Sequence, residues 1–276
     1  MQKVNRLQAA VVDKVSTLVA APSRRRDEAL QFTMRVSGVE QLSAHQRRVT
    51  FTAPEFADYA VTGPDEYFGL LMPHPVAGLR MPDPERYNTR QAVHRVPEHE
   101  RPELRWYTVR AHRPAVREID VDFVIHEHVG PGTRWAAGAR VGDIAGFRGG
   151  GSGYQQPVTP QVLVADEAAL PALSAILESL PVDVPDLRVY LEVGEDFAAP
   201  AIASTLQPVV LRLHGERGDA VIAALADDPP LEPGFAWVCG EAGMVAKVRR
   251  HLLHETGLHR QQILFSGYWK LGHARG

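Results

Sequence analysis

A change in hydrophobic pattern near residue 150 constrains the fold of this chain most strongly. From Leu30 to Phe147 the apolar and polar residues tend to alternate, which is the period of half-buried strands. After "RGGGSGYQQPVTP" the apolar residues form short continuous runs, separated by segments with helical spacing. We therefore expect two domains, and the length of 276 residues favours the same division.

Six strand candidates and no long helical pattern occupy the first part of the chain. They are "QFTMRV", "RRVTF", "EYFGLLM", "RWYTVR", "EIDVDFVIH" and "RVGDIAGF". A small antiparallel barrel is the economical architecture for such a set, because closure removes exposed sheet edges. The Pro/His/Arg-rich segment 73–102 is expected as a long loop. The "RGGGSG" run is expected as a turn between domains, since no Lys-Ser/Thr pair follows to complete a phosphate loop.

The second part alternates buried strands with helices. The expected strands are "QVLVA", "LRVYLEV", "PVVLRL", "FAWVC" and "ILFSGYW". The expected helices include "EAALPALSAILESL", "GDAVIAALA" and "GMVAKVRRHLLHETG". Strands that alternate with helices predict a parallel, doubly wound sheet.

Composition narrows the class of function. The 30 basic and 33 acidic residues nearly balance, which favours a small-molecule partner over nucleic acid. Cys239 is the only cysteine, which excludes an intrachain disulfide and a Cys-rich metal site and fits a reducing cytoplasm. The N-terminal segment has the period of an amphipathic helix but no signal-peptide pattern, and no membrane span is expected.

Two stretches of the first part suggest a ligand that contains both phosphate and a flat ring. In "RWYTVR" Arg105 and Tyr107 share one face of a strand, although an exposed Arg beside a half-buried Tyr would look the same. In "HVGPGTRWAAGARVGD" a Gly-rich turn opens a helix, so free backbone N–H groups could bind a diphosphate. An ordinary capped loop is the alternative for the second stretch.

A third stretch lies at a strand end in the second part. "FAWVCGEAGMVAKVRRHL" places Cys239, Gly240 and Glu241 between a buried strand and a helix. Ligands of open parallel sheets bind at the carboxyl ends of the strands, and Gly240 would let one approach the backbone. Because structural cysteines are common in buried strands, Cys239 alone carries little weight.

Taken in order, these stretches resemble the siderophore-interacting protein family, within the ferredoxin reductase-like flavoproteins. The resemblance rests on "DFVIHEHVGPGTRWAAGARVGD", "VADEAALPALSAILESLP", "WVCGEAGMVAKVRRHLLHETGL" and "FSGYWKLGHA", and it covers about residues 28–273. It implies a six-stranded antiparallel Greek-key FAD-binding barrel, followed by a parallel-sheet NAD(P)-binding-like α/β domain. The implied boundaries are 1–27 for an N-terminal helical extension, 28–155 for the barrel domain and 156–276 for the α/β domain.

The resemblance also implies roles for individual residues. Arg105 would contact FAD phosphate, Tyr107 would pack against the isoalloxazine ring, and Thr108 would bond near its reactive edge. The remaining implied FAD contacts are Asp122, His126, Thr133, Arg134 and Trp135. The implied contacts of NADPH or NADH are Asp166, Glu167, Cys239, Gly240, Glu241, Tyr268 and Trp269. The sequence departs from the family at Ala165, where glycine is usual, and at Cys239, where alanine is common.

The implied activity is reduction of ferric siderophores. A nicotinamide donor reduces the flavin, and the flavin reduces Fe(III) to Fe(II), so no catalytic protein side chain is demanded. Arg47, Arg48 and Lys270 are expected to attract the anionic chelate. No bound metal site is expected, because His126 and His128 share a strand face without a third ligand. Two alternatives stay open: a reductase that uses a ferredoxin-type partner, and a non-catalytic siderophore-binding protein.

Overall fold

The computed structural model describes residues 24–25, 30–86, 88–125, 130–154, 160–228 and 234–272. The helical extension expected at 1–27 lies outside these residues. Only Arg24 and Arg25 of that segment are described, and they form a short strand. The described chain divides into two compact units, Arg24–Ser152 and residues 153–272. Among the described helices, none combines the length and apolar character that a membrane crossing requires.

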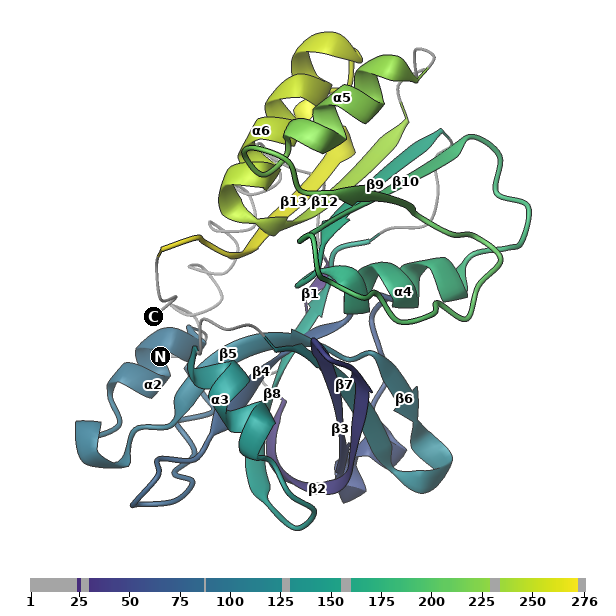
Figure 1. Ribbon diagram of the computed structural model, residues 1–276. Coiled ribbons are helices and arrows are strands. Elements are labelled where there is room, and N and C mark those ends of the chain that lie inside the picture. The colour runs from purple at the N-terminus through teal and green to yellow at the C-terminus, as the bar shows by residue number, and fades with distance from the viewer. Residues whose placement is uncertain are drawn as a thin grey trace. The chain divides into compact units, whose positions relative to one another are not determined.

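The first unit is an antiparallel sheet that contains every strand predicted for it (Figure 1). Its strands are β1 (Arg24–Arg25), β2 (Gln31–Ser43), β3 (Gln46–Thr52), β4 (Tyr67–Met72), β5 (Glu103–Thr108), β6 (Ala111–Arg113), β7 (Glu118–Val124) and β8 (Ile144–Ser152). Its helices are the 3-10 turns Pro54–Ala57, Glu98–Glu100 and Pro114–Val116 and the α-helices α2 (Thr89–His94) and α3 (Pro131–Gly138). The strand count exceeds six because β1 and β6 are short additional strands.

Two edge strands that follow each other in the chain close this sheet into a barrel. The order is β5-β4-β8-β2-β3-β7-β6, with β1 also paired to β8. Between β5 and β6, the Val109 N–H donates to the Glu66 carbonyl beside β4, and the Arg110 N–H donates to the Asp120 carbonyl of β7. The β5–β6 segment therefore bridges β4 and β7. The predicted antiparallel barrel is confirmed, but with eight strands where six were predicted.

Alternating strand residues fill the barrel with aromatic rings. Phe147 of β8 stacks on Phe32 and on Phe68, with ring centroids 4.7 Å apart in each pair. Phe56, from the first 3-10 turn, meets Phe147 edge-on at 5.5 Å. Such stacked and edge-to-face pairs add to the hydrophobic gain of burying the rings.

The glycine run "GGGS", expected as a turn, instead continues β8 to Ser152, so this expectation is wrong. Its place in the sheet has a steric reason. A Cβ at Gly150 would lie only 2.5 Å from ring atoms of Tyr67, and one at Gly146 would lie 2.6 Å from the Met81 sulfur. The strand therefore uses glycine where residues of β4 and of the long loop come too close to its outer face for a Cβ.

A buried guanidinium anchors the 73–102 loop on that outer face. Arg148 of β8 donates to the Pro84 carbonyl at 2.9 Å and to the Arg86 carbonyl at 2.8 Å. Gln31 of β2 donates to the Pro82 carbonyl at 2.8 Å. Because Ala145 and Phe147 of β8 point into the core, the alternating Arg148 points outward.

The substitution Arg148→Met should loosen this loop while leaving the barrel folded. Loss of the guanidinium removes hydrogen bonds to the loop carbonyls, and we expect about 1 kcal/mol less stability. Limited proteolysis should then cut within 73–102 faster than in the wild type, which mass spectrometry of the fragments would show. Equal cleavage rates at these sites would contradict the anchoring role.

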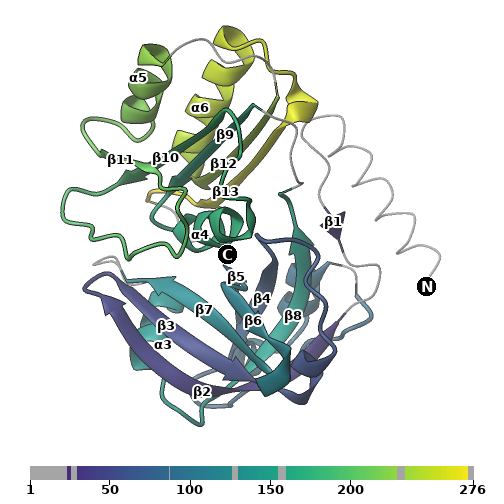
Figure 2. The same ribbon diagram turned by 90° about the vertical axis from the view of Figure 1, so that its right-hand side faces the viewer.

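The second unit is a parallel sheet with helices on both faces, as predicted. Its elements are β9 (Gln161–Asp166), α4 (Leu170–Ser179), β10 (Leu187–Val193), β11 (Val209–Arg212), α5 (Asp219–Asp227), β12 (Phe235–Glu241), α6 (Ala242–Glu255), the 3-10 turn Arg260–Gln262 and β13 (Ile263–Trp269). Figures 1 and 2 show α5 and α6 on one face and α4 on the other.

The strand order of this sheet locates its ligand-binding edge. The order is β11-β10-β9-β12-β13, with every pair parallel. Connections run outward in both directions from the central pair β9 and β12, so the topological switch point lies between these two strands. In sheets of this kind ligands bind beyond the carboxyl ends of the strands at the switch point. Asp166 ends β9 and Glu241 ends β12, so both residues lie at that edge.

Candidate functional site

The barrel brings together two sequence motifs that are separated by some twenty residues. Arg105 and Tyr107 of β5 pair with Leu70 and Phe68 of β4, so they share the core-facing side of the strand. A Cβ built on Gly132, in the first turn of α3, would overlap the Tyr107 hydroxyl and lie 3.7 Å from Cγ of Arg105. The β5 pair and the α3 N-terminus therefore form one site.

Tyr107 is held by its ring contact with Phe123 and by the position of its hydroxyl beside α3. Its ring lies 4.4 Å from that of Phe123, centroid to centroid, and Gly132 leaves room for its hydroxyl. Burial raises the pKa of the Tyr107 phenol, so the residue is neutral across the physiological range. Tyr107 therefore offers a fixed, uncharged ring.

The N-terminus of α3 offers donors for an anion. Gly130 is the N-cap, and no side chain of the described residues caps this helix end. A Cβ at Gly130 would meet no atom of the described residues within 4 Å. Arg105 adds a positive charge, and its guanidinium forms an ion pair with Glu103 at 3.2 Å. Backbone N–H groups, a guanidinium and a flat ring are the groups that suit the diphosphate and ring of FAD, so the described residues fit this cofactor.

Several of the other predicted FAD residues are buried or contact other parts of the protein. Thr108 is buried at the end of β5. The Thr133 hydroxyl donates to the Val124 carbonyl at 3.5 Å, and Arg134 is exposed. Trp135 stacks on Phe51 at 5.8 Å and so packs on the barrel core. His126 lies outside the described residues.

Three further predicted residues form polar contacts within the first unit. Arg48 forms a two-pronged ion pair with Asp122, with N–O distances of 2.7 and 2.9 Å. Arg47 donates to the Ala137 and Ala139 carbonyls at 3.0 and 3.1 Å, which supports the C-terminus of α3. Asp122, Arg47 and Arg48 therefore all have protein partners, and their ligand roles stay predictions.

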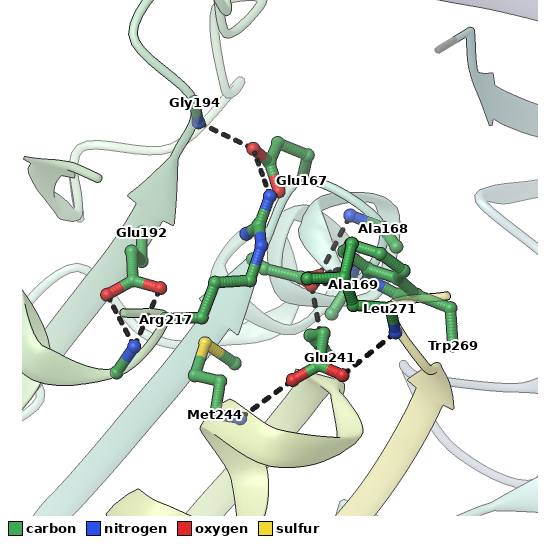
Figure 3. Close-up of polar contacts among 12 residues, drawn as sticks. Glu167, Ala168, Ala169, Glu192, Gly194, Arg217, Glu241, Met244, Trp269 and Leu271 are labelled. Atoms are coloured by element: carbon green, nitrogen blue, oxygen red, sulfur yellow. Dashed lines mark hydrogen bonds and ion pairs between the residues drawn. The ribbon is translucent and has the colours of Figure 1, made fainter. Parts of the chain in front are cut away.

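The second unit gathers predicted and unpredicted residues at the carboxyl edge of its sheet (Figure 3). Asp166 is fully buried and accepts four hydrogen bonds. The donors are Ala168 N at 2.9 Å, Ala169 N at 3.1 Å, Glu241 N at 2.8 Å and Trp269 Nε1 at 2.6 Å. One carboxylate thus joins the ends of β9, β12 and β13.

An ion pair lies beside this carboxylate. Arg217, from the loop after β11, donates to both oxygens of buried Glu167 at 3.1 and 3.3 Å. Its guanidinium also lies 5.0 Å from the centre of the Trp269 ring (Figure 3). Glu167 accepts a further hydrogen bond from the Gly194 N–H. Sequence reasoning missed Arg217, because a lone arginine in a loop carries no spacing signal.

The predicted Cys239-Gly240-Glu241 turn has a clear local cause. Gly240 has φ of 146°, a region that favours glycine, and a Cβ there would lie 2.6 Å from Cγ of Asp166. Cys239 is buried one residue earlier, paired in register with Ser266 of β13. Tyr268 is half-buried near the end of β13, and Lys270 is exposed just beyond it. The nucleotide roles of these residues stay predictions.

Asp166 should give the protein an unusual dependence of stability on pH. Burial and the neighbouring Glu167 charge raise the pKa of Asp166 from 3.8 to about 7. Between these two values the folded chain binds the proton more strongly than the unfolded chain does. The contribution of Asp166 to the free energy of unfolding is therefore fully present below pH 4. It is lost as the pH rises to about 7, with a slope of about 1.4 kcal/mol per pH unit.

Chemical denaturation from pH 4 to pH 7.5 would measure this effect against Asp166→Asn. The wild type should lose free energy of unfolding relative to the variant as the pH rises. The comparison isolates Asp166, because the other titrating groups are present in both proteins. A difference that stays constant across the range would contradict this expectation.

Comparisons with known proteins agree with both halves of the structure. Residues 35–153 match the siderophore-interacting FAD-binding domain, and residues 158–272 match the siderophore-interacting protein model. The ferric vibriobactin reductase ViuB of Vibrio cholerae is 30% identical over 239 residues, which cover 84% of this chain and 86% of ViuB. The mycobactin import ATP-binding/permease protein IrtA of Mycolicibacterium thermoresistibile is 29% identical over 84% of this chain, which spans only 25% of IrtA.

Solved structures give the same result. A siderophore utilization protein from T. fusca has a TM-score of 0.75 at 27% identity, covering 91% of this chain and 96% of its own. The siderophore-interacting protein SipS from Aeromonas hydrophila has a TM-score of 0.73 at 26% identity, covering 89% and 93%. A ferredoxin reductase of carbazole 1,9a-dioxygenase has a TM-score of 0.60 at 18% identity, which shows the shared fold alone.

Proposed function

The chain belongs to the siderophore-interacting protein family, and from this premise we propose that it is an FAD-dependent reductase of ferric siderophores, with a reduced nicotinamide dinucleotide as electron donor. The similarity to ferric vibriobactin reductase covers most of both chains and supports this reaction. The chain spans only a quarter of the mycobactin importers that it also matches, so their transport activity is not part of the proposal.

One observation carries the proposal: Arg105, Tyr107 and the N-terminus of α3 meet at a single site. A guanidinium and free N–H groups suit a diphosphate, and a neutral ring beside them suits a flavin. Arg105 and Tyr107 lie on a strand of the barrel, and a rigid element of this kind favours a preorganised site.

The described side chains have binding and orienting roles in this reaction. When bound, FAD supplies the ability to take two electrons as a hydride and release them one at a time, which reduction of Fe(III) requires. Arg105 and the first turn of α3 would hold the diphosphate. Tyr107, whose ring contacts Phe123 and whose hydroxyl lies beside Gly132, would fix the plane of the flavin ring. One donor oxidised then yields two Fe(II), and the reaction requires no protein nucleophile.

The substrate would be an iron chelate of negative charge. Lys270 is exposed directly after β13, and it supports the proposal as a cation that could attract such a chelate. Arg47 and Arg48 add positive charge on the barrel, although their guanidinium groups also bind protein partners. We place the reaction in the cytoplasm, because the only cysteine is a buried free thiol, as is usual in reducing compartments.

An iron-release assay tests this function. The protein, loaded with FAD, is mixed anaerobically with NADH or NADPH, a ferric siderophore and a coloured Fe(II) chelator. We expect two Fe(II) per donor oxidised, and no Fe(II) from protein stripped of FAD. Turnover only with an added reduced ferredoxin would favour the ferredoxin-dependent alternative. Binding of the ferric chelate without Fe(II) formation under any donor would favour a non-catalytic binding protein.

A further inference from the structure

Three helices of the second unit begin at the carboxyl edge of the sheet, and each begins against a carboxylate of the protein itself. In front of α4, the Asp166 side chain accepts hydrogen bonds from the Ala168 and Ala169 N–H groups. The Leu170 N–H is directed to the Glu167 carbonyl, and Pro171 has no N–H to donate. The first helix end therefore has few donors left for a ligand.

The start of α5 also contacts a buried carboxylate, through the N–H of its N-cap. Its N-cap is Gly218, and the N–H of Gly218 donates to both carboxylate oxygens of Glu192, at 2.9 and 3.0 Å. Glu192 belongs to β10 and is fully buried. Asp219 places a second carboxylate in the first turn, where it binds Lys247 at 2.7 Å.

The start of α6 is capped by Glu241. Its carboxylate accepts hydrogen bonds from the Gly243 and Met244 N–H groups, the latter at 2.9 Å, and also from the Leu271 N–H at 3.1 Å (Figure 3). Glu241 is 5% exposed. Each of these three helix starts thus already contacts a carboxyl group that belongs to the protein.

These contacts matter because dinucleotides usually bind doubly wound sheets through the same helix ends. The diphosphate normally lies on free N–H groups at the helix after the first strand, reached over a glycine-rich turn. Here the corresponding turn reads "DEAALP" and contains no glycine. The neighbouring guanidinium, Arg217, is occupied by Glu167 and lies against Trp269. A diphosphate would meet buried carboxylates where other proteins offer N–H donors.

We infer that the second unit recognises its electron donor through the nicotinamide-ribose half, and that Asp166, Glu192 and Glu241 exclude the diphosphate from the helix N-termini. This inference rests on the proposed function, because it concerns the donor of that reaction. Donors without the adenosine diphosphate half should therefore reduce the flavin nearly as well as the whole dinucleotide.

Stopped-flow reduction of the FAD-loaded protein by NADH and by reduced nicotinamide mononucleotide tests the inference. Each second-order rate constant is divided by that of the same donor with free FAD, which removes the difference in intrinsic reactivity. We expect the two normalised constants to agree within about tenfold. A normalised constant more than about a hundredfold lower for the mononucleotide would overturn the inference. Failure of both donors would instead overturn the proposed nicotinamide-dependent function.

Binding of ADP-ribose, which lacks the nicotinamide, gives a second readout that does not depend on turnover. Calorimetry should detect no binding to the wild type at micromolar concentrations. Glu241→Ala frees the Gly243 and Met244 N–H groups, so this variant should bind ADP-ribose at least about tenfold more tightly than the wild type. Glu195→Ala is the matched control, because it removes an exposed carboxylate beyond β10. Micromolar binding to the wild type, or no gain in a folded Glu241→Ala variant, would contradict the inference.

Discussion

Replacing Gly132 with alanine should strip the barrel of most of its FAD. The new Cβ would overlap the Tyr107 hydroxyl, so either the ring or the first turn of α3 must move. Overpacking of this kind costs about 2 kcal/mol. Because both moving parts belong to the proposed FAD site, we expect FAD affinity to fall about thirtyfold.

A titration of the stripped protein with FAD, followed by flavin fluorescence, measures this change. Gly138→Ala is the matched control: it lies in the same helix, and its Cβ would meet nothing within 4 Å. The control should keep wild-type affinity. If Gly132→Ala bound FAD as tightly as Gly138→Ala does, Tyr107 and α3 would not form the FAD site.

Removing the guanidinium of Arg217 should destabilise the second unit by about 3 kcal/mol, because Arg217→Met leaves the Glu167 carboxylate buried without its counterion. The Glu167 side chain is only 4% exposed and that of Arg217 17% exposed, so water cannot replace the lost contact fully. Urea denaturation of the variant and the wild type measures the loss.

A second substitution distinguishes two causes of the lost stability: the unpaired charge of Glu167 and the lost contact of Arg217 with the Trp269 ring. Glu167→Gln removes the charge while its amide oxygen can still accept from the Gly194 N–H. The double variant should therefore recover most of the stability lost in Arg217→Met. Additive losses would show that Arg217 contributes through its contact with the Trp269 ring instead.

The hydrophobic periodicity predicted most of the fold, because the burial of one element leaves its pattern in the sequence of that element. The alternation of Ile119, Val121 and Phe123 predicts a strand, and β7 places these three residues in the barrel core. Its other face was expected to be exposed, but Asp120 and Asp122 are buried there as well. The run "ILFSGYW" corresponds residue for residue to β13. The prediction of a turn at the glycine run was wrong. The local preference of glycine for turns is weaker here than the packing of Tyr67 against Gly150, which is a contact between distant segments.

The candidate site was predictable only where a motif holds its residues on one element. Arg105 and Tyr107 share a face of β5 by strand geometry alone. Glu192 and Arg217 gave no signal, because each acquires its partner when the loop after β11 meets the strand ends of β9 and β10. Asp166 and Trp269 likewise meet only when the ends of β9 and β13 come together in the sheet, a contact across 103 positions of sequence.

An anaerobic absorption spectrum of the FAD-loaded protein tests the central claim most directly. The oxidised flavin bands should bleach on addition of a reduced nicotinamide donor, and they should return when a ferric siderophore is added in the absence of oxygen. Bands that persist with both NADH and NADPH, or that stay bleached in the presence of the ferric siderophore, would contradict the assignment as a ferric-siderophore reductase.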